Sequence, residues 1–376
     1  MSKQVFILGD SLLDGGVFGF KATIQNHQTI GPSANLNLGE FLSYKLINKI
    51  PRPYYEYNSI QNKFIINPLN TNFAVSSSTF APPFYPNKVT VVIPTQVDSF
   101  IVGNNIFEDD IVLIDGGFND FSHLLKECFY LKTTNDTTRM IRFFENVNLL
   151  FPGYDPSNAF DSILIIINDY LNNGILPIVK TNFDKIIATK INKMIFLNIG
   201  LNRLPNLNYY PPILNRDLYL LSDKNDIETE KLFEAIQPIT EAFNLSLRNY
   251  YNNNSKFIMI DNKIALDLII YDIYLNNGQT YGIINYTQNT VPVLLDNLSS
   301  NYGLPLYGFI NNNDGVITPF ISNNPTDWNG KPIVSQVPSI PITAYNGLYC
   351  DMYHPTALGH QAFGNIIFNI LRDYII

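Results

Sequence analysis

Short apolar runs alternate with longer amphipathic stretches along the chain, and this alternation constrains the fold most strongly. Five of the runs have the length and the residue types of β-strands. Residues 111–115 are the clearest case, because Ile, Val and Leu follow one another there as they do in a parallel strand that is buried on both faces. The five predicted strands span residues 5–8, 71–75, 111–115, 194–198 and 257–260.

Helical patterns separate these strands and follow the last one. Strand and helix alternate about five times, which favours a parallel sheet covered by helices on both faces. Because we find neither an internal repeat nor a convincing linker, we predict one α/β domain over residues 1–376. Two stretches without a regular pattern, 121–157 and 275–345, are predicted to be irregular insertions, and the second is too long for an ordinary connection. The predicted helices span residues 38–50, 95–102, 157–171, 178–191, 227–250 and 355–376.

The composition restricts the class of protein. With 46% hydrophobic and 15% charged residues, the chain can bury a core and does not resemble disordered proteins. A net charge of −8 argues against nucleic acid as a partner, because phosphates require a basic surface. The sequence has no His-Glu-x-x-His, paired Cys-x-x-Cys, Gly-x-Gly-x-x-Gly or Gly-x-Ser-x-Gly motif, so we expect no metal and no cofactor.

The sequence indicates neither a membrane span nor a disulfide framework. No stretch approaches the roughly 18–20 apolar residues of a membrane span, and the amino terminus lacks the charged and apolar regions of a signal peptide. We therefore expect a soluble protein that is cytoplasmic unless a leader has been removed. The two cysteines, Cys128 and Cys350, are too few for a framework, and the sequence leaves open whether they pair.

The first predicted strand leads directly into the sequence Gly9-Asp10-Ser11-Leu12. Gly9 gives the backbone the freedom that a sharp exit from a strand requires. Ser11 would then lie at the carboxyl end of the strand, where open α/β sheets bind their ligands. A serine there can act as a nucleophile if a base and an oxyanion site lie within reach. Taken alone, a Gly-Asp-Ser sequence more often marks a turn.

The search for a base is short, because the chain contains only four histidines. Asp351 precedes His354 by three residues, just before the last predicted helix. In a turn, this spacing lets the carboxylate contact one imidazole nitrogen while the other faces outward, as a serine nucleophile requires. A charge at a helix start is the simpler interpretation of Asp351. We expect His360 to pack within its helix, and His27 and His123 to be surface residues.

Asn119 follows the predicted strand 111–115 through a Gly-Gly turn. An amide at the carboxyl end of a strand can donate a hydrogen bond to a developing oxyanion. Backbone N–H groups near Ser11 and Ser77 could complete an oxyanion hole with it. Helix capping is the simpler interpretation of Asn119.

Three segments together resemble the GDSL, or SGNH, hydrolase family. Residues 9–12 (Gly-Asp-Ser-Leu), 117–120 (Gly-Phe-Asn-Asp) and 351–354 (Asp-Met-Tyr-His) are similar to its first, third and fifth sequence blocks and occur in the same order. The resemblance spans the whole chain. It implies a flavodoxin-like three-layer α/β/α sandwich with a five-stranded parallel sheet, and ester hydrolysis through a Ser–His–Asp arrangement.

The resemblance also implies a role for each matching residue. Ser11 would be the nucleophile, His354 the general base and Asp351 the residue that orients the base. Asn119 and the backbone N–H of Ser11 would be oxyanion donors, and Ser77 occupies the position of the third donor.

The departure from the family pattern lies in its second block. The family usually has a glycine where this chain has Ser77. A serine still offers a backbone N–H, but it resists positive φ. If the turn requires positive φ, the third donor would be displaced, and the loss of one such donor costs roughly 10²–10³ in rate.

The combination predicts a serine esterase or lipase that works through an acyl-enzyme on Ser11. An acyltransferase that uses the same site, and a non-catalytic glycan- or lipid-binding protein that has kept the fold, are the alternatives. The expected partner is a small-molecule, lipid or glycan ester, and the sequence leaves the acyl chain and the oligomeric state open.

Overall fold

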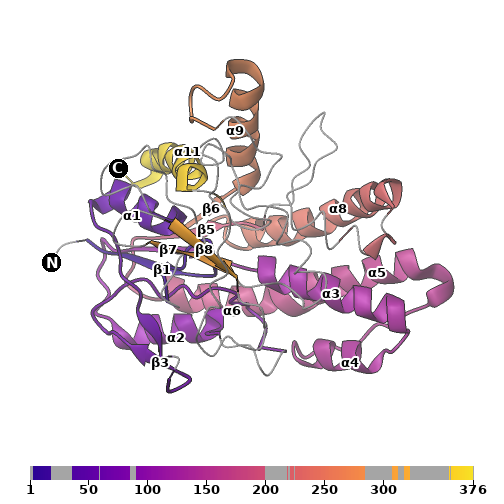
Figure 1. Cartoon of the computed structure of the whole chain (residues 1–376). Helices are drawn as coiled ribbons and strands as arrows, with labels where there is room; N and C mark the ends of the chain where they lie inside the picture. Colours follow the sequence, from indigo (N-terminus) through magenta and orange to yellow (C-terminus); the bar gives the residue numbers. More distant parts are fainter. Residues whose placement is uncertain are drawn as a thin grey trace.

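The computed structural model describes residues 3–17, 36–58, 60–84, 90–199, 218, 221–223, 225–283, 307–311, 317–321, 355 and 357–375. At its centre lies a parallel sheet of four strands in the order β1-β4-β5-β6 (Figure 1). The predicted α/β class is confirmed. The strands are β1 (Val5–Leu8), β4 (Ile111–Asp115), β5 (Lys193–Leu197) and β6 (Phe257–Ile260).

Among the described residues, the sheet has four regular strands, one fewer than the predicted five. The segment 71–75 does run parallel to β1, joined by backbone hydrogen bonds from Ile7 to Thr71 (2.9 Å), from Phe73 to Ile7 (2.6 Å) and from Val75 to Gly9 (3.1 Å). It is not a regular strand because the Asn72 side chain accepts from the Ala74 N–H (3.0 Å) and donates to the Leu13 carbonyl (2.9 Å). With this edge segment, the spatial order is that of a doubly wound flavodoxin-like sheet.

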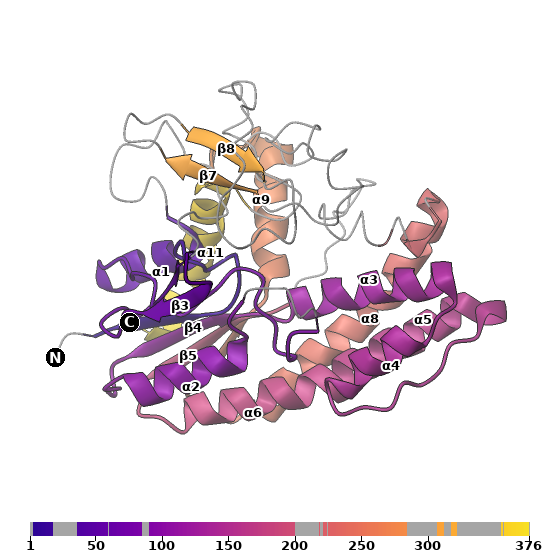
Figure 2. The same ribbon diagram turned by 60° about the horizontal axis from the view of Figure 1, so that its bottom comes forward.

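Alternating side chains of the buried strands build two cores, one on each face of the sheet. Phe6 and Leu8 point into one core, and Val5 and Ile7 into the other. On the first face pack α2 (Ile93–Gly103), α6 (Leu176–Ile187) and α8 (Asp226–Tyr250), and on the second α1 (Leu38–Ile47), α9 (Asn262–Asn276) and α11 (Ala357–Ile375) (Figures 1 and 2). This arrangement is the expected α/β/α sandwich.

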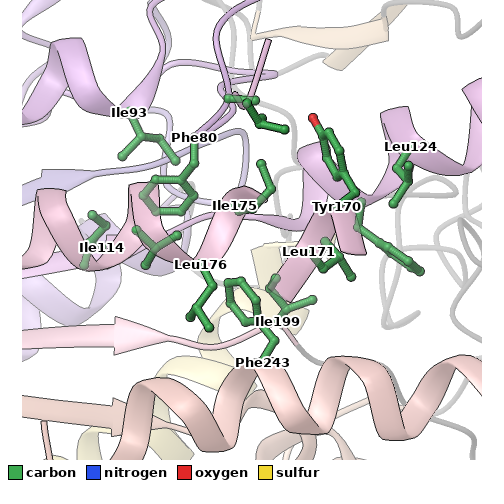
Figure 3. Packing of buried hydrophobic residues seen from close by; sticks show 14 of the residues in the cluster. Phe80, Ile93, Ile114, Leu124, Tyr170, Leu171, Ile175, Leu176, Ile199 and Phe243 are labelled. Atoms are coloured by element: carbon green, nitrogen blue, oxygen red, sulfur yellow. The ribbon is translucent and has the colours of Figure 1, made fainter. Parts of the chain in front are cut away.

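A long helical stretch crosses the first face and does not end where the sequence predicts. The 3₁₀ turn η1 (Pro156–Asn158) and α5 (Ala159–Asn168) continue through a π-helix, η2 (Asp169–Ile175), into α6. The predicted helix end at residues 172–174 is wrong. Gly174 does not end the helix but allows it to pack closely on Val147, since a Cβ on Gly174 would lie 2.8 Å from Cγ2 of Val147. The wide turn puts Tyr170, Leu171 and Ile175 into the core (Figure 3).

This stretch, Pro156–Ile187, is also long and apolar enough to cross a membrane by length and composition, contrary to the sequence-based expectation. Half of the apolar 18-residue segment within it is buried inside the fold. Its buried side chains belong to the core on the first face of the sheet, and core helices of this kind meet the same criterion.

The prediction that residues 121–157 are irregular is also wrong. They lie mainly in α3 (Phe118–Thr134) and α4 (Thr138–Glu145), and the buried side chains Leu124, Cys128 and Leu131 follow one another at helical spacing on α3. Of residues 275–345, the structure describes the end of α9, residues up to 283 and a hairpin of β7 (Tyr307–Asn311) and β8 (Ile317–Ile321). A second hairpin joins β2 (Tyr55–Asn58) to β3 (Lys63–Ile66). The single-domain assignment stays a prediction.

The close contact of α11 with α1 generates a stability prediction. A Cβ at Gly364 would lie 2.3 Å from Cδ1 of the buried Phe41 ring. We expect Gly364→Ala to lower the free energy of unfolding by about 1–3 kcal/mol, because overpacking outweighs the helix propensity of alanine. Asn369→Ala, at an exposed position of the same helix, should change it by less than about 0.5 kcal/mol. Urea unfolding tests both, and equal stability of the two variants would contradict the packing argument.

Candidate active site

The turn that carries Ser11 is built directly on the end of β4. Gly9 has a φ of 137°, and a Cβ at this position would lie 1.7 Å from Oδ1 of Asp115, so only glycine fits. The Asp10 N–H donates to the same oxygen (2.9 Å), and the Leu12 N–H donates to Oδ1 of Asp10 (3.1 Å). Ser11 is thereby held, half-buried, just beyond the carboxyl end of β1.

The second turn, residues 75–78, brings Ser77 to the same edge of the sheet. Its backbone closes through the Ser78 N–H and the Val75 carbonyl (3.1 Å), while the backbone N–H and hydroxyl of Ser76 both donate to Oδ2 of Asp14 (2.7 Å each). The turn does require positive φ, and Ser77 adopts it, with a φ of 65°. A serine thus takes the left-handed conformation that glycine adopts without strain.

Asn119 links the two turns. Its Nδ2 donates to Oδ2 of Asp10 (3.0 Å) and to the carbonyl oxygen of Ser78 (3.0 Å). The N-cap of α3 is Gly117, with no side-chain cap, so the simpler interpretation of Asn119 as a helix cap is wrong. Both Nδ2 hydrogens are engaged by protein oxygens, so Asn119 must give up one of these acceptors before it can donate to a substrate.

The backbone donors of the two turns are satisfied with two exceptions that matter here. The N–H groups of Asp10 and Leu12 donate to carboxylates, and those of Ser76 and Ser78 also have acceptors. For the N–H groups of Ser11 and Ser77, the described part of the chain provides no acceptor, nor does it give the Ser11 hydroxyl a partner. Backbone donors that are left unpaired at such an edge are uncommon and are available to a ligand oxygen.

Buried carboxyl groups hold these loops in place. Asp120 accepts from the N–H groups of Phe80 (2.9 Å) and Ala81 (2.8 Å), and desolvation raises its pKa to about 6. Asp14 accepts from the N–H groups of Gly16, Val17 and Ser76, and burial raises its pKa as well. Since each carboxyl is nearly saturated with backbone donors, these groups are supports for the loops.

Gln96 of α2 is a further support, which the sequence analysis missed. Its Oε1 accepts from the Gly9 N–H (2.8 Å), and its Nε2 donates to the Gly9 carbonyl (3.0 Å) and the Ser78 hydroxyl (2.9 Å). One fully buried side chain therefore connects the Ser11 turn to the Ser77 turn from below. The available signal was a glutamine beside the apolar stripe of the predicted helix 95–102, since buried polar side chains are normally hydrogen-bonded.

A small pocket opens beside the Ser77 turn, with a cavity volume of about 10 Å³ that continues into open solvent. Part of its lining is aromatic, because Phe143 stacks on Tyr170 (4.6 Å between ring centroids) and meets Phe84 edge-on (5.1 Å). Polar side chains contribute to the rest of the lining. The lining residues are Ser77, Thr79, Ala81, Pro82, Pro83, Phe84, Thr90, Asp120, His123, Phe143 and Tyr170.

The other predicted residues have mixed outcomes. His354, Asp351 and His27 lie outside the described residues, so the base and its orienting carboxylate stay predictions. His360 is 1% exposed, and its predicted packing in the helix is confirmed. His123 is half-buried, belongs to α3 and lines the pocket, which is open to solvent.

Two further findings concern cysteines and metals. Cys128 is a buried free thiol of α3, and burial raises its pKa, while Cys350 lies outside the described residues. Within the part of the chain that the structure covers, no three His, Cys, Asp or Glu side chains are arranged to hold a metal ion.

Comparison with known proteins gives only distant likenesses, among solved structures. No family model matches the chain, and no curated protein matches it. Among solved structures, an extracellular lipase from Streptomyces rimosus is similar over 70% of this chain and 82% of that chain, with 9% sequence identity and a TM-score of 0.33. A likeness at this level says nothing of the reaction.

The positive φ of Ser77 generates a prediction about stability. Non-glycine residues in this conformation cost roughly 1–2 kcal/mol, and a glycine costs about 0.5–1 kcal/mol in unfolded-state entropy. We therefore expect Ser77→Gly to leave the free energy of unfolding unchanged or to raise it by up to about 1 kcal/mol, whereas Ser77→Val lowers it by about 1–3 kcal/mol. Ser255→Gly, at an exposed loop position, is the matched control and should be slightly destabilising. Urea denaturation measures all three, and Ser77→Gly destabilised as much as this control would refute the strain.

Proposed function

We propose that the chain is a serine ester hydrolase with Ser11 as its nucleophile. One observation carries the proposal: the N–H groups of Ser11 and Ser77 have no acceptor in the described structure, and they lie on two turns that Asn119 binds together. The half-buried Ser11 hydroxyl beside them likewise has no partner among the described residues. Fixed backbone donors around a hydroxyl are what acyl transfer requires, since they stabilise the tetrahedral oxyanion. Their position at the carboxyl edge of a parallel sheet supports the same assignment.

In the proposed reaction, Ser11 Oγ attacks the ester carbonyl while His354 takes its proton, and Asp351 orients the imidazole. The oxyanion accepts hydrogen bonds from the N–H groups of Ser11 and Ser77. The alcohol leaves with the proton from His354, and water then hydrolyses the acyl-enzyme with the same base. The roles of His354 and Asp351 rest on the sequence resemblance.

Asn119 contributes only after a local exchange of partners. We propose that the substrate oxyanion replaces the Ser78 carbonyl as acceptor for Nδ2, while the bond to Asp10 is kept. A developing negative charge is a stronger acceptor than a neutral carbonyl, so the exchange becomes favourable as the transition state forms. This gives Asn119 a contact that is stronger in the transition state than in the resting enzyme.

The pocket beside Ser77 is the proposed acyl site. It shares Ser77 with the proposed oxyanion donors, so an acyl group whose carbonyl oxygen contacts that N–H can extend into it. Its limited space and the closely packed rings of Phe84, Phe143 and Tyr170 favour a short acyl chain over a long one.

A non-catalytic binding protein is the second candidate. The observation that favours it is the engagement of both Nδ2 hydrogens of Asn119 by Asp10 and Ser78. In such a protein, the N–H groups of Ser11 and Ser77 would bind a ligand oxygen without attack by the hydroxyl.

The decisive test is hydrolysis of p-nitrophenyl esters by the wild type and the variant Ser11→Ala. We expect turnover by the wild type and a fall of roughly 10⁴-fold or more in Ser11→Ala, because no other group supplies the nucleophile. His354→Ala should lose activity to a similar extent. Ser255→Ala, an exposed serine, is the control and should behave as the wild type.

A fluorophosphonate probe separates the two candidate functions. Covalent labelling of the wild type that disappears in Ser11→Ala supports the hydrolase. If neither turnover nor Ser11-dependent labelling is found for a folded wild type, the binding protein is the better assignment.

The acyl site generates a prediction about chain length. We expect Phe84→Ala to shift the best substrate toward longer acyl chains, because it removes an aromatic ring from the lining of the pocket. The value of kcat/KM should rise by roughly 10-fold for each extra carbon that the new space holds. Phe160→Ala, on the outer side of α5, is the control. The values of kcat/KM for esters of about two to about eight carbons measure the shift, and an unchanged optimum in Phe84→Ala would place the acyl group elsewhere.

A further inference from the structure

Asp115 lies beneath the Ser11 turn and is a candidate for a role of its own. It ends β4, is 3% exposed, and supports the turn through the hydrogen bond from Asp10 N–H to its Oδ1 (2.9 Å). The same oxygen fills the space that a side chain at Gly9 would need. No residue of the described structure donates a hydrogen bond to the other oxygen, Oδ2.

The carboxyl group of Asp10 adjoins that of Asp115, but the two groups differ in the hydrogen-bond donors around them. Asp10 is also 3% exposed, but both of its oxygens receive donors, Oδ1 from Leu12 N–H (3.1 Å) and Oδ2 from Asn119 Nδ2 (3.0 Å). Hydrogen bonds of this kind favour the ionised form of a carboxyl group. Burial raises the pKa of Asp115 well above its usual range, and the charge of Asp10 is the second cause of this shift.

Two adjacent buried carboxyl groups cannot both be ionised at low cost, so the pair retains a proton. Asp115 has the weaker set of donors and a buried Oδ2 without one, so the proton belongs on Asp115. The neighbouring Asp10 carboxylate interacts with the Asp115 carboxyl group and can accept a hydrogen bond from it. An O–H donor there would stabilise the charge that Asp10 presents to Leu12 and Asn119.

We propose that Asp115 is a positioning residue that stays protonated and donates a hydrogen bond to the Asp10 carboxylate, so that one buried acid pair holds the Ser11 turn and the Asn119 amide in register. This role rests on the proposed hydrolase function and extends it to a residue outside the three sequence blocks. Asp115 touches no substrate in it.

Two acidic groups of the described structure belong to the surroundings of Asp115. Asp10 comes from the turn after β1, and its charge raises the pKa of Asp115. Asp120 comes from the first turn of α3, and the charge of Asp10 contributes to its raised pKa. From α2, the neutral amide of Gln96 reaches the backbone of Gly9. The negative charge of Asp10 therefore favours the protonated form of Asp115.

The test compares Asp115→Asn with Asp115→Ala. An asparagine can accept from Asp10 N–H and donate to the Asp10 carboxylate, so it mimics the protonated acid at every pH. We expect Asp115→Ala to lose roughly 10²-fold in kcat, because a small displacement of the nucleophile has that effect, and Asp115→Asn to recover most of the loss. Asp109→Asn, at an exposed position before β4, is the matched control.

The pH profile gives a readout that a merely structural role would not change. As pH rises, the wild type ionises Asp115 against Asp10 and loses activity on its basic limb, whereas Asp115→Asn cannot. The ratio of kcat/KM in Asp115→Asn to that in the wild type should therefore rise by roughly 10-fold or more along the basic limb of the wild-type profile. A ratio that stays constant over this range would overturn the proposal.

Thermal unfolding tests the acid pair without reference to activity, so its failure is distinguishable from failure of the proposed function. A raised folded-state pKa stabilises the fold at low pH, and this contribution is lost as pH rises through that pKa. The melting temperature of Asp115→Asn minus that of the wild type should therefore increase from about pH 5 to about pH 8. A difference that is the same at both pH values would overturn the shared proton even if Ser11 proves to be the nucleophile.

Discussion

The candidate site depends on the hydrogen bonds that the Asp10 carboxylate accepts. One oxygen accepts from the backbone of the Ser11 turn, and the other accepts from the side chain of Asn119, which also reaches the Ser77 turn. Three segments that are far apart in the sequence therefore share one buried group. Loss of this carboxylate would release Ser11 and Asn119 from each other at the same time, because no other described contact joins their turns so directly.

The sheet is organised to support this carboxylate from below. Asp115, Gln96 and Gly9 meet under the Ser11 turn, and each comes from a different element: β4, α2 and the exit of β1. Every backbone polar group that is buried beneath this turn needs a hydrogen-bond partner. The amide of Gln96 and the carboxyl of Asp115 supply these partners, so the sheet edge can be packed tightly while the N–H groups of Ser11 and Ser77 have no acceptor in the described part of the chain.

The sequence allowed prediction of the parts that depend on local patterns. The apolar runs of β1, β4, β5 and β6 and the long α8 were recognisable, because burial on both faces or on one stripe leaves a clear signature. The segment 71–75 failed as a strand because a single side chain, Asn72, competes with the ladder for hydrogen bonds. Residues 121–157 failed as a loop because the polar positions of α3 and α4 obscured their apolar faces. The contacts of Asp115 and Gln96 could not be predicted, since they depend on tertiary distances between β1, β4 and α2.

The conformation of Ser77 shows how the site combines strain with support. A serine with a φ of 65° is held there by neighbours on both sides. Ser76 is bound twice by Asp14, and the Ser78 hydroxyl lies within hydrogen-bond distance of the carbonyl groups of Val75 (2.6 Å) and Val91 (2.7 Å) and can donate its hydrogen to either. Two anchored residues leave the one between them no alternative conformation, so the cost of positive φ is met by the hydrogen bonds of its neighbours. The position that departs from the family pattern therefore still holds a fixed backbone N–H with no acceptor among the described residues, and the missing glycine does not by itself argue against an oxyanion donor at Ser77.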